Sequence, residues 1–155
     1  MVADDIDPPY ALIDQAWGLY DARDLNLAIG RAALRALDLG EPVRVARAIT
    51  YEACFRSARS YADSQTLLRQ AVAMAAALAN PRLDVIVTAA QAVTAFFGAR
   101  YRDVIEACDR TKQRYLTADI GGLSWEMTTA QLVELWSRAW LGQRDELRRQ
   151  VPAAI

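Results

Sequence analysis

The pattern most informative about the fold lies in the stretch Phe96-Phe97-Gly98-Ala99-Arg100-Tyr101-Arg102-Asp103-Val104-Ile105-Glu106-Ala107. Bulky apolar residues close one helical pattern there, and a glycine and an aromatic residue mark a short break. A second helical pattern with small residues follows directly after the break. This order is typical of an αα-hairpin, in which two antiparallel helices are joined by a short turn.

The same pattern occurs at three other places in the chain. A bulky residue precedes the turn in each copy: Trp17 before Tyr20-Asp21-Ala22-Arg23, Phe55 before Ser60-Tyr61-Ala62-Asp63, and Trp140 before Gly142-Gln143-Arg144-Asp145. Tyr20, Tyr61 and Tyr101 are spaced by 41 and 40 residues, whereas the fourth copy has Arg144 near that place. We expect each turn aromatic to pack on the bulky residue of its own hairpin, and the hairpins to stack because one alone cannot bury its apolar face. The alternative is coincidence among the aromatic residues of an eight-helix bundle.

Helix-forming residues dominate from Tyr10 onward, and turn residues divide the chain into about eight expected helices. These helices span residues 10–21, 24–39, 42–59, 64–79, 81–97, 102–116, 124–141 and 145–151. The sequence contains no Asn-Gly or Asp-Gly hairpin turn and no clean alternating strand pattern. It therefore predicts an all-α protein, with a flexible leader over residues 1–9 and one domain of about four antiparallel hairpins over residues 10–155.

Particular residues are expected to start and stop these helices. Gly40 suits a left-handed helix terminator. Asp63 or Ser64 is expected to cap the helix over residues 64–79, and Ser124 the helix over residues 124–141. Apolar stripes at helical spacing run along several of the helices, including a broad aromatic face formed by Leu132, Leu135, Trp136, Ala139 and Trp140.

Residues 98–107 resemble the turn and second helix of a tetratricopeptide unit, in which a glycine, an aromatic residue and a small residue mark the hairpin. The resemblance implies a right-handed α-α superhelix. The repeat of about 40 residues is longer than the usual 34 of that family, so the helices would be longer. Only the third unit carries the glycine, and the proline expected after the second helix is clear only at Pro81.

A second resemblance covers most of the chain. Residues 31–37 (Arg-Ala-Ala-Leu-Arg-Ala-Leu), 56–59 (Arg-Ser-Ala-Arg) and 122–126 (Gly-Leu-Ser-Trp-Glu) are similar to the tetratricopeptide-like C-terminal region of large bacterial serine/threonine kinases fused to a predicted ATPase. The kinase and ATPase parts are not found in these 155 residues. The resemblance implies a helical interaction region of such a signalling protein, or one related to it.

Composition excludes several classes of function. The net charge of −1 gives no general attraction to nucleic acid or to an anionic membrane. The chain has no histidine, which removes the usual general base and the commonest zinc ligand. Cys54 and Cys108 each lie in an apolar helical pattern and are interpreted as small core residues of a cytoplasmic protein. We expect neither a cofactor nor a metal.

The candidate catalytic features are weak, so the chain is not expected to be an enzyme. Residues 121–124 (Gly-Gly-Leu-Ser) favour a turn and helix cap over an anion-binding nest, because the phosphate-loop spacing is missing. Acidic pairs such as Asp145 with Glu146 lie where carboxylates favour a helix start. Trp136 and Trp140 are interpreted as core between the last two hairpins, and Trp125 is expected to be the tryptophan most exposed to a partner.

The leading functional hypothesis is a protein- or peptide-binding scaffold. Polar or amphipathic residues within the first helices of the hairpins are expected to face a concave groove: Arg44, Arg47, Tyr51, Gln91, Thr94, Gln131 and Glu134. Trp125 is a further candidate contact residue. One alternative is homo-oligomerisation through the terminal repeat, because residues 151–155 are apolar rather than a polar cap. The other is a small-ligand sensor with an interhelical pocket walled by tryptophan or tyrosine.

Overall fold

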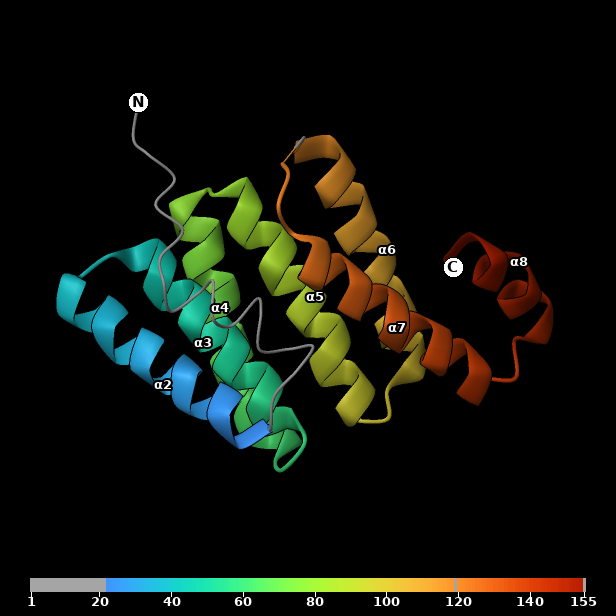
Figure 1. Ribbon diagram of the computed structural model, residues 1–155, viewed down its shortest axis with the longest axis horizontal. Helices are drawn as coiled ribbons and strands as arrows, with labels where there is room; N and C mark the ends of the chain where they lie inside the picture. Colours follow the sequence, from blue (N-terminus) through green and yellow to red (C-terminus); the bar gives the residue numbers. More distant parts are fainter. Residues whose placement is uncertain (1–21, 119, 155) are drawn as a thin grey trace.

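The computed structural model describes residues 22–118 and 120–154, and this part of the chain is all α-helical (Figure 1). It contains α2 (Ala22–Leu39), α3 (Pro42–Ser57), α4 (Tyr61–Leu78), α5 (Pro81–Phe97), α6 (Tyr101–Ala118), α7 (Ser124–Trp140) and α8 (Arg144–Ala154). The all-α prediction is confirmed for these residues. The expected leader, the expected helix over residues 10–21 and the first turn tyrosine, Tyr20, lie outside the described residues.

α3 and α5 begin where the sequence predicts, since each has a side-chain cap followed by proline. The Glu41 carboxylate accepts hydrogen bonds from the amides of Val43 and Arg44 at 3.3 and 3.1 Å. The Asn80 side-chain oxygen accepts one from the amide of Leu83 at 3.0 Å. The following proline occupies the first turn, where no backbone donor is needed.

The predicted caps of α4 and α7 are wrong. Ser60, in extended conformation, caps α4 by accepting a hydrogen bond from the amide of Asp63 at 3.3 Å. Ser64 lies one turn inside the helix, where its hydroxyl donates to a backbone carbonyl at 2.7 Å. Ser124 is the first helical residue of α7, after Leu123 in the cap position with no side-chain cap. Leu123 is instead fully buried, so packing fixes this helix start.

Two glycines end helices in the left-handed region: Gly40, whose φ is +63°, as predicted, and Gly142, whose φ is +71°. Gly98 has an ordinary φ of −81° and serves a different purpose. A Cβ at this position would lie 2.5 Å from a ring carbon of Tyr61, far inside van der Waals contact. Gly98 therefore lets the turn between α5 and α6 approach the aromatic residue that begins α4.

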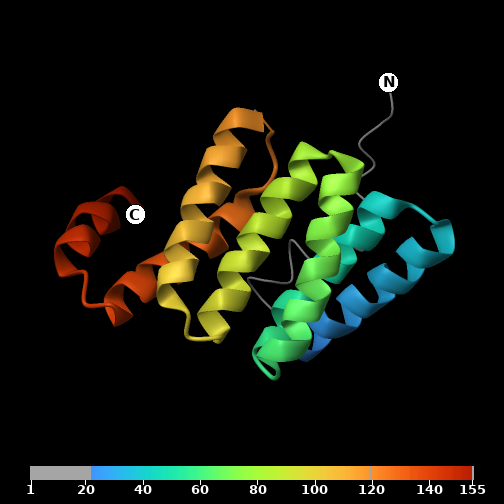
Figure 2. The same cartoon turned by 180° about the vertical axis from the view of Figure 1, so that it is seen from behind.

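The helices form hairpins that lie side by side: α3 with α4, α5 with α6, and α7 with α8 (Figures 1 and 2). α5 packs on both α3 and α7, so the first helices of the three hairpins form a continuous layer. α4 and α6 each also contact the first helix of the following hairpin. α7 is therefore the last helix of this layer. It contacts α5 and α6, and α8 follows it in the chain.

The turn tyrosines link one hairpin to the next. The ring of Tyr61 lies against Gly98, in the turn of the following hairpin. The ring of Tyr101 lies 6.2 Å from that of Trp140, at the end of α7, with an angle of 8° between the planes. Tyr101 also contacts Phe96 of its own hairpin, with ring centroids 6.0 Å apart, which confirms the expected contact for this copy. The repeat seen in the sequence is thus a repeat of contacts between neighbouring hairpins.

Small residues allow the close approach of the helices. α5 is the central helix, and the buried part of its surface includes four alanines: Ala89, Ala90, Ala92 and Ala95. Larger residues of the core gather where α3, α5 and the start of α7 meet, around Tyr51 and Leu123. The packing of α7 on α5 sets which side chains of α7 face the interior and which face solvent.

Candidate functional site

α7 is an inverted surface helix, since its charged side chains face inward and two of its three tryptophans, Trp136 and Trp140, face outward. Glu126 and Glu134 are 2% and 1% exposed, and the side chain of Arg138 is 13% exposed. These three are the only charged residues of the helix. A helix on the surface of a soluble protein normally has the opposite distribution.

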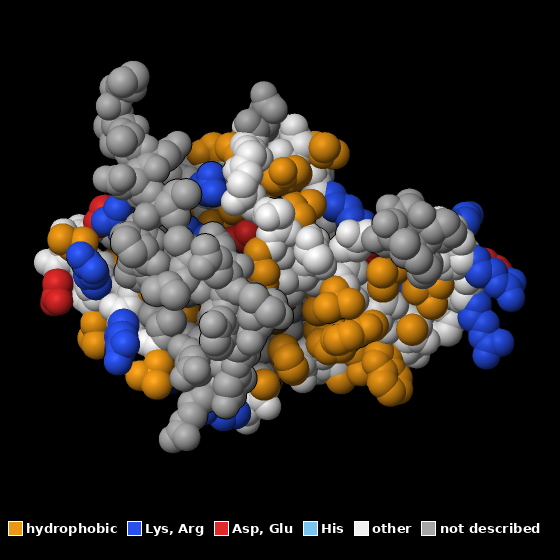
Figure 3. All heavy atoms as spheres, in the orientation of Figure 1, with side chains coloured by type: hydrophobic (Ala, Val, Ile, Leu, Met, Phe, Trp, Pro, Cys, Tyr) orange, Lys and Arg blue, Asp and Glu red, His pale blue; other side chains and the backbone are white. Residues whose placement is uncertain are grey.

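The outward face of α7 carries an apolar stripe at four-residue spacing, made of Leu132, Trp136 and Trp140. They are 43%, 50% and 71% exposed. Phe97, at the end of α5, is 52% exposed. These four residues are called the aromatic surface, and Figure 3 shows hydrophobic side chains gathered over this end of α5 and α7.

The aromatic surface rests on rings that fix its geometry. Phe96 lies beneath it, with its ring centroid 5.6 Å from Trp136 and 5.8 Å from Phe97. Trp140 stacks on Tyr101. Such aromatic pairs add about 1 kcal/mol each beyond the area they bury. The exposed rings are therefore held in place from below and present a preformed apolar face to solvent.

Glu134 is held between two cations from different helices. Its carboxylate accepts a hydrogen bond from Lys112 Nζ of α6 at 2.6 Å. It also accepts two from the guanidinium of Arg138, at 2.8 and 3.0 Å. Burial raises the pKa of the Glu134 carboxyl, but these hydrogen bonds and positive charges outweigh burial and place the pKa below its ordinary value. The carboxylate thus fixes the rotation of α7 against α6.

Glu126 makes a second inward contact, at the other end of α7. Its Oε1 accepts a hydrogen bond from the hydroxyl of Tyr51 on α3 at 2.7 Å. Arg47 donates to the same hydroxyl oxygen at 3.1 Å and lies 4.0 Å from the carboxylate. Burial, and then the neighbouring charge of Glu126, raise the pKa of Tyr51 well above its ordinary value. The two glutamates together turn the aromatic stripe outward.

Three residues predicted to face a binding groove are in the interior instead. Tyr51, Thr94 and Glu134 are each about 1% exposed, because each has a polar partner inside the protein. Tyr51 donates to Glu126, and Glu134 accepts from two cations. The hydroxyl of Thr94 donates to the carbonyl of Gln91, one turn earlier, at 3.1 Å. A polar residue within an apolar first helix is satisfied here by the core rather than by a groove.

The other predicted contact residues are scattered. Arg44 lies 3.5 Å from the carboxylate of Glu41, and Arg47 belongs to the buried contact with Tyr51. Gln91 is half-buried in a hollow of about 270 Å³ that α5 shares with α4 and α6, the second helices of two hairpins. Gln131 is exposed, next to Leu132 of the aromatic surface. The structure therefore does not join the predicted set into one groove.

The tryptophans exchange the roles expected for them. Trp125 is half-buried, with its ring 5.9 Å from that of Tyr51 in an edge-to-face contact. Trp136 and Trp140, which were expected in the core, are the exposed ones. The four-residue spacing in the sequence placed these two on one face correctly. The sequence does not indicate that this face is the outward one, because the charged residues of α7 all lie on the other side and charged residues normally face solvent.

Among the residues that the structure describes, the cavity that Trp125 lines is too small for a ligand. The cavity lined by Tyr51, Cys54, Trp125 and Glu126 has a volume of about 10 Å³, which is about the room that one water needs. A drug-sized ligand needs a pocket of about 300 Å³ or more. This cavity is therefore too small to be the tryptophan-walled pocket of a small-ligand sensor.

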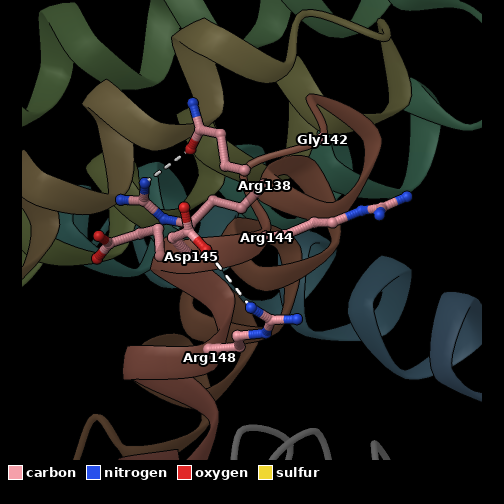
Figure 4. A pocket seen from close by; sticks show the side chains of 7 residues that line it. Arg138, Gly142, Arg144, Asp145 and Arg148 are labelled. Atoms are coloured by element: carbon pink, nitrogen blue, oxygen red, sulfur yellow. Dashed lines mark hydrogen bonds and ion pairs between the residues drawn. The ribbon is translucent and has the colours of Figure 1, made fainter.

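The hollow between α7 and α8 is polar, and most of its charged side chains are already paired within the protein (Figure 4). Arg138 donates to the side-chain oxygen of Gln143 at 3.0 Å, in addition to Glu134. Arg148 lies 3.7 Å from the carboxylate of Asp145. Arg144 extends away from both in Figure 4. These side chains do not converge on a common point, as an anion site would require.

The loop before α7 is occupied by a side chain of the protein. The guanidinium of Arg82, at the start of α5, donates to the carbonyls of Gly121 and Gly122 at 3.2 and 3.0 Å. Gly122 has a φ of +75°, which a glycine adopts without strain. This loop joins α6 to α7 and is fastened to α5, in keeping with its interpretation as a turn.

The described residues offer little reactive chemistry. Cys54 and Cys108 are buried free thiols, as predicted, and burial raises the pKa of each to about 12. Cys108 donates a weak hydrogen bond to the carbonyl of Ala130. In the part of the chain whose side chains the structure describes, no group of three or more histidine, cysteine, aspartate or glutamate side chains is placed to hold a metal ion. No helix in this part is long and apolar enough to cross a membrane.

Comparison with models of protein families, with curated proteins and with solved structures finds no match to this chain. In the chain's own geometry, the aromatic surface is the feature that most needs a functional explanation.

Proposed function

We propose that this chain is a non-catalytic protein-interaction module, with the aromatic surface as its contact site. The observation that carries the proposal is the inverted character of α7. Glu126, Glu134 and Arg138 make contacts inside the protein. Leu132, Trp136 and Trp140 face solvent. The centre of a protein interface has this composition, since it is enriched in aromatic residues and depleted of charged ones.

The size of the aromatic surface supports a protein partner. A large aromatic side chain has about 200 Å² of surface. With the exposed fractions of its four members, the aromatic surface therefore presents about 400 Å² of side-chain surface to solvent. Contiguous apolar patches of that size on soluble proteins are often functional. The exposed rings lie on an open face rather than in a cavity, so a flat or helical protein surface fits them better than a small molecule.

The tetratricopeptide-like class is part of the proposal, together with a right-handed superhelix of hairpins. It is supported by the repeat of tyrosine contacts between hairpins and by the continuous layer formed by α3, α5 and α7. In such a scaffold the layer of first helices lines the binding side. A place in a bacterial kinase-associated signalling protein of the cytoplasm is the setting that the sequence resemblance implies.

Affinity capture with matched variants tests this function. The full chain, Trp140→Gln and Leu116→Gln would be used as baits in a bacterial lysate, after chemical cross-linking. Leu116, on α6, is 78% exposed and lies outside the aromatic surface, so its variant controls for the loss of an exposed apolar side chain. The proposal predicts that specific proteins captured by the natural chain and by Leu116→Gln are lost with Trp140→Gln. Equal capture by all three baits would contradict it.

A further inference from the structure

We infer that the occupant of the aromatic surface is a second copy of this chain, with the two α7 helices packed antiparallel across a two-fold axis at Trp136. The inference rests on the proposed function, because it names the partner of the same surface. Two-fold pairs are the commonest protein oligomers, and each copy contributes the same patch to such an interface.

The charge of the surface suits pairing with itself. In a two-fold pair, a residue on the axis faces its own copy, and a residue off the axis faces one that lies equally far from the axis on the other side. Exposed charges of one sign on the two copies would therefore repel each other. The outward face of α7 avoids this problem, since Glu126, Glu134 and Arg138 all point inward. The exposed neighbours of the stripe on α7 are uncharged: Ser124, Thr128, Gln131 and Ala139. The part of the rim that α7 supplies therefore brings no charge against its copy.

The shape of the stripe is also self-complementary. Leu132, Trp136 and Trp140 follow one another at about 6 Å along the helix axis, from a small residue to two large ones. In an antiparallel pair centred on Trp136, the small Leu132 of one copy faces the large Trp140 of the other. The taper of one stripe therefore fills the reverse taper of its copy, whereas a parallel pair would place both Trp140 rings together.

The area agrees with a protein interface of ordinary size. A stable interface buries about 800 Å² on each partner, with an apolar centre and a polar rim. The aromatic surface supplies about half of that area as its centre. The polar side chains beside the stripe and the adjoining end of α5 would supply the rest of the buried area as the rim of the interface.

The first test is the mass of the natural chain in solution. Sedimentation equilibrium over a wide range of protein concentration is expected to show a weight-average mass that rises from 17.2 kDa to twice that value. A chain that stays at 17.2 kDa up to millimolar concentration overturns the inference. Such a monomer still leaves the proposed function open to its own test, because capture of another protein through Trp140 does not require self-pairing.

The second test uses opposite charges at the two-fold axis. Trp136→Arg and Trp136→Glu each place like charges together, and each is expected to weaken pairing by about 30-fold or more, as for the loss of a central interface tryptophan. Mixing the two variants is expected to restore a dimer, because the introduced guanidinium of one chain then faces the introduced carboxylate of the other. Circular dichroism of each variant, compared with Leu116→Arg and Leu116→Glu, shows whether the fold is kept. Two folded variants that pair as well as the natural chain, or whose mixture stays monomeric, contradict the inference.

Discussion

Trp136 and Trp140 are exposed because the space beneath them is already filled. Phe96 lies under Trp136 and Tyr101 under Trp140, so neither indole can turn into the core without displacing a ring. The sequence places both tryptophans on one helix face, but helical spacing alone does not say which of several apolar stripes meets the neighbouring helices. That choice depends on Glu126 and Glu134 finding partners on α3 and α6, far away in the sequence.

Gly98 provides a test at a single residue. Gly98→Ala is expected to destabilise the fold by about 1–3 kcal/mol, because the new methyl group would overlap the Tyr61 ring and force it or the turn to move. Urea denaturation of the variant measures the change in the free energy of unfolding.

Gly30→Ala is the matched control for this substitution. Gly30 lies in α2 with no atom within 4 Å of a new Cβ, so alanine there is expected to be neutral or to stabilise by about 0.5–1 kcal/mol. Equal effects of the two substitutions would show that Tyr61 does not pack on the turn of the next hairpin.

Glu134 gives stability a dependence on pH. Its pKa in the folded chain lies below that in the unfolded chain, so the folded form binds fewer protons. The resulting stabilisation is complete above the ordinary carboxyl pKa and is lost as pH falls through the folded value. Glu134→Gln is expected to cost about 2 kcal/mol at pH 7, since Lys112 and Arg138 lose their counter-charge and Lys112 is only partly shielded from solvent.

Thermal unfolding between pH 7 and pH 3 measures this dependence. The difference in melting temperature between the natural chain and Glu134→Gln should shrink as the solution is acidified. Asp145→Asn is the control, because Asp145 is exposed and its carboxylate lies at 3.7 Å from an exposed arginine. A difference that is constant with pH would mean that the Glu134 carboxylate is not held by the two cations.

At the scale of helices, most boundaries are predicted by local chemistry. Glu41-Pro42 and Asn80-Pro81 start helices through bonds within one turn, and Gly40 ends one through its own backbone. The start of α7 is predicted at the right residue but with the wrong cap, because it depends on the burial of Leu123 rather than on the side chain of Ser124. The burial of Tyr51, Thr94 and Glu134 is not predicted for a similar reason, since contacts between helices decide which polar groups are buried.

The contact between α3 and α7 can be measured by a double-mutant cycle. Tyr51→Phe leaves the Glu126 carboxylate without its 2.7 Å donor and is expected to cost about 1.5–3 kcal/mol. In the presence of Glu126→Gln, the same substitution should cost at least about 1 kcal/mol less. Additive effects in urea denaturation would show that this hydrogen bond does not hold the two helices together.

For the whole molecule, the described hairpins share packed interfaces, so they are expected to unfold as one unit. Cys54 lies in α3 and Cys108 in α6, both are buried, and the pKa of each is raised to about 12. Each thiol should therefore react with a thiol reagent only when the stack opens. Cys54→Ser and Cys108→Ser each leave one reporter.

The rate of thiol labelling across a urea series checks this expectation. The two single-thiol variants should give the same free energy of opening once their own stabilities are taken into account. Labelling of one thiol at a much lower urea concentration than the other would show that the hairpins open separately, as weakly coupled repeats do.

The all-α character and the repeat of hairpins follow from the sequence because helical periodicity and the 40-residue spacing are properties of the chain itself. The position of the contact surface depends on how α7 is rotated against α5 and α6. Hydroxyl-radical footprinting of the tryptophans tests that rotation and its consequence together. In dilute solution Trp136 and Trp140 should be oxidised faster than Trp125, and in concentrated solution their oxidation should fall while that of Trp125 is unchanged. Faster oxidation of Trp125 in the dilute chain, or no protection of Trp136 and Trp140 on concentration, would contradict an outward aromatic surface that pairs with its copy.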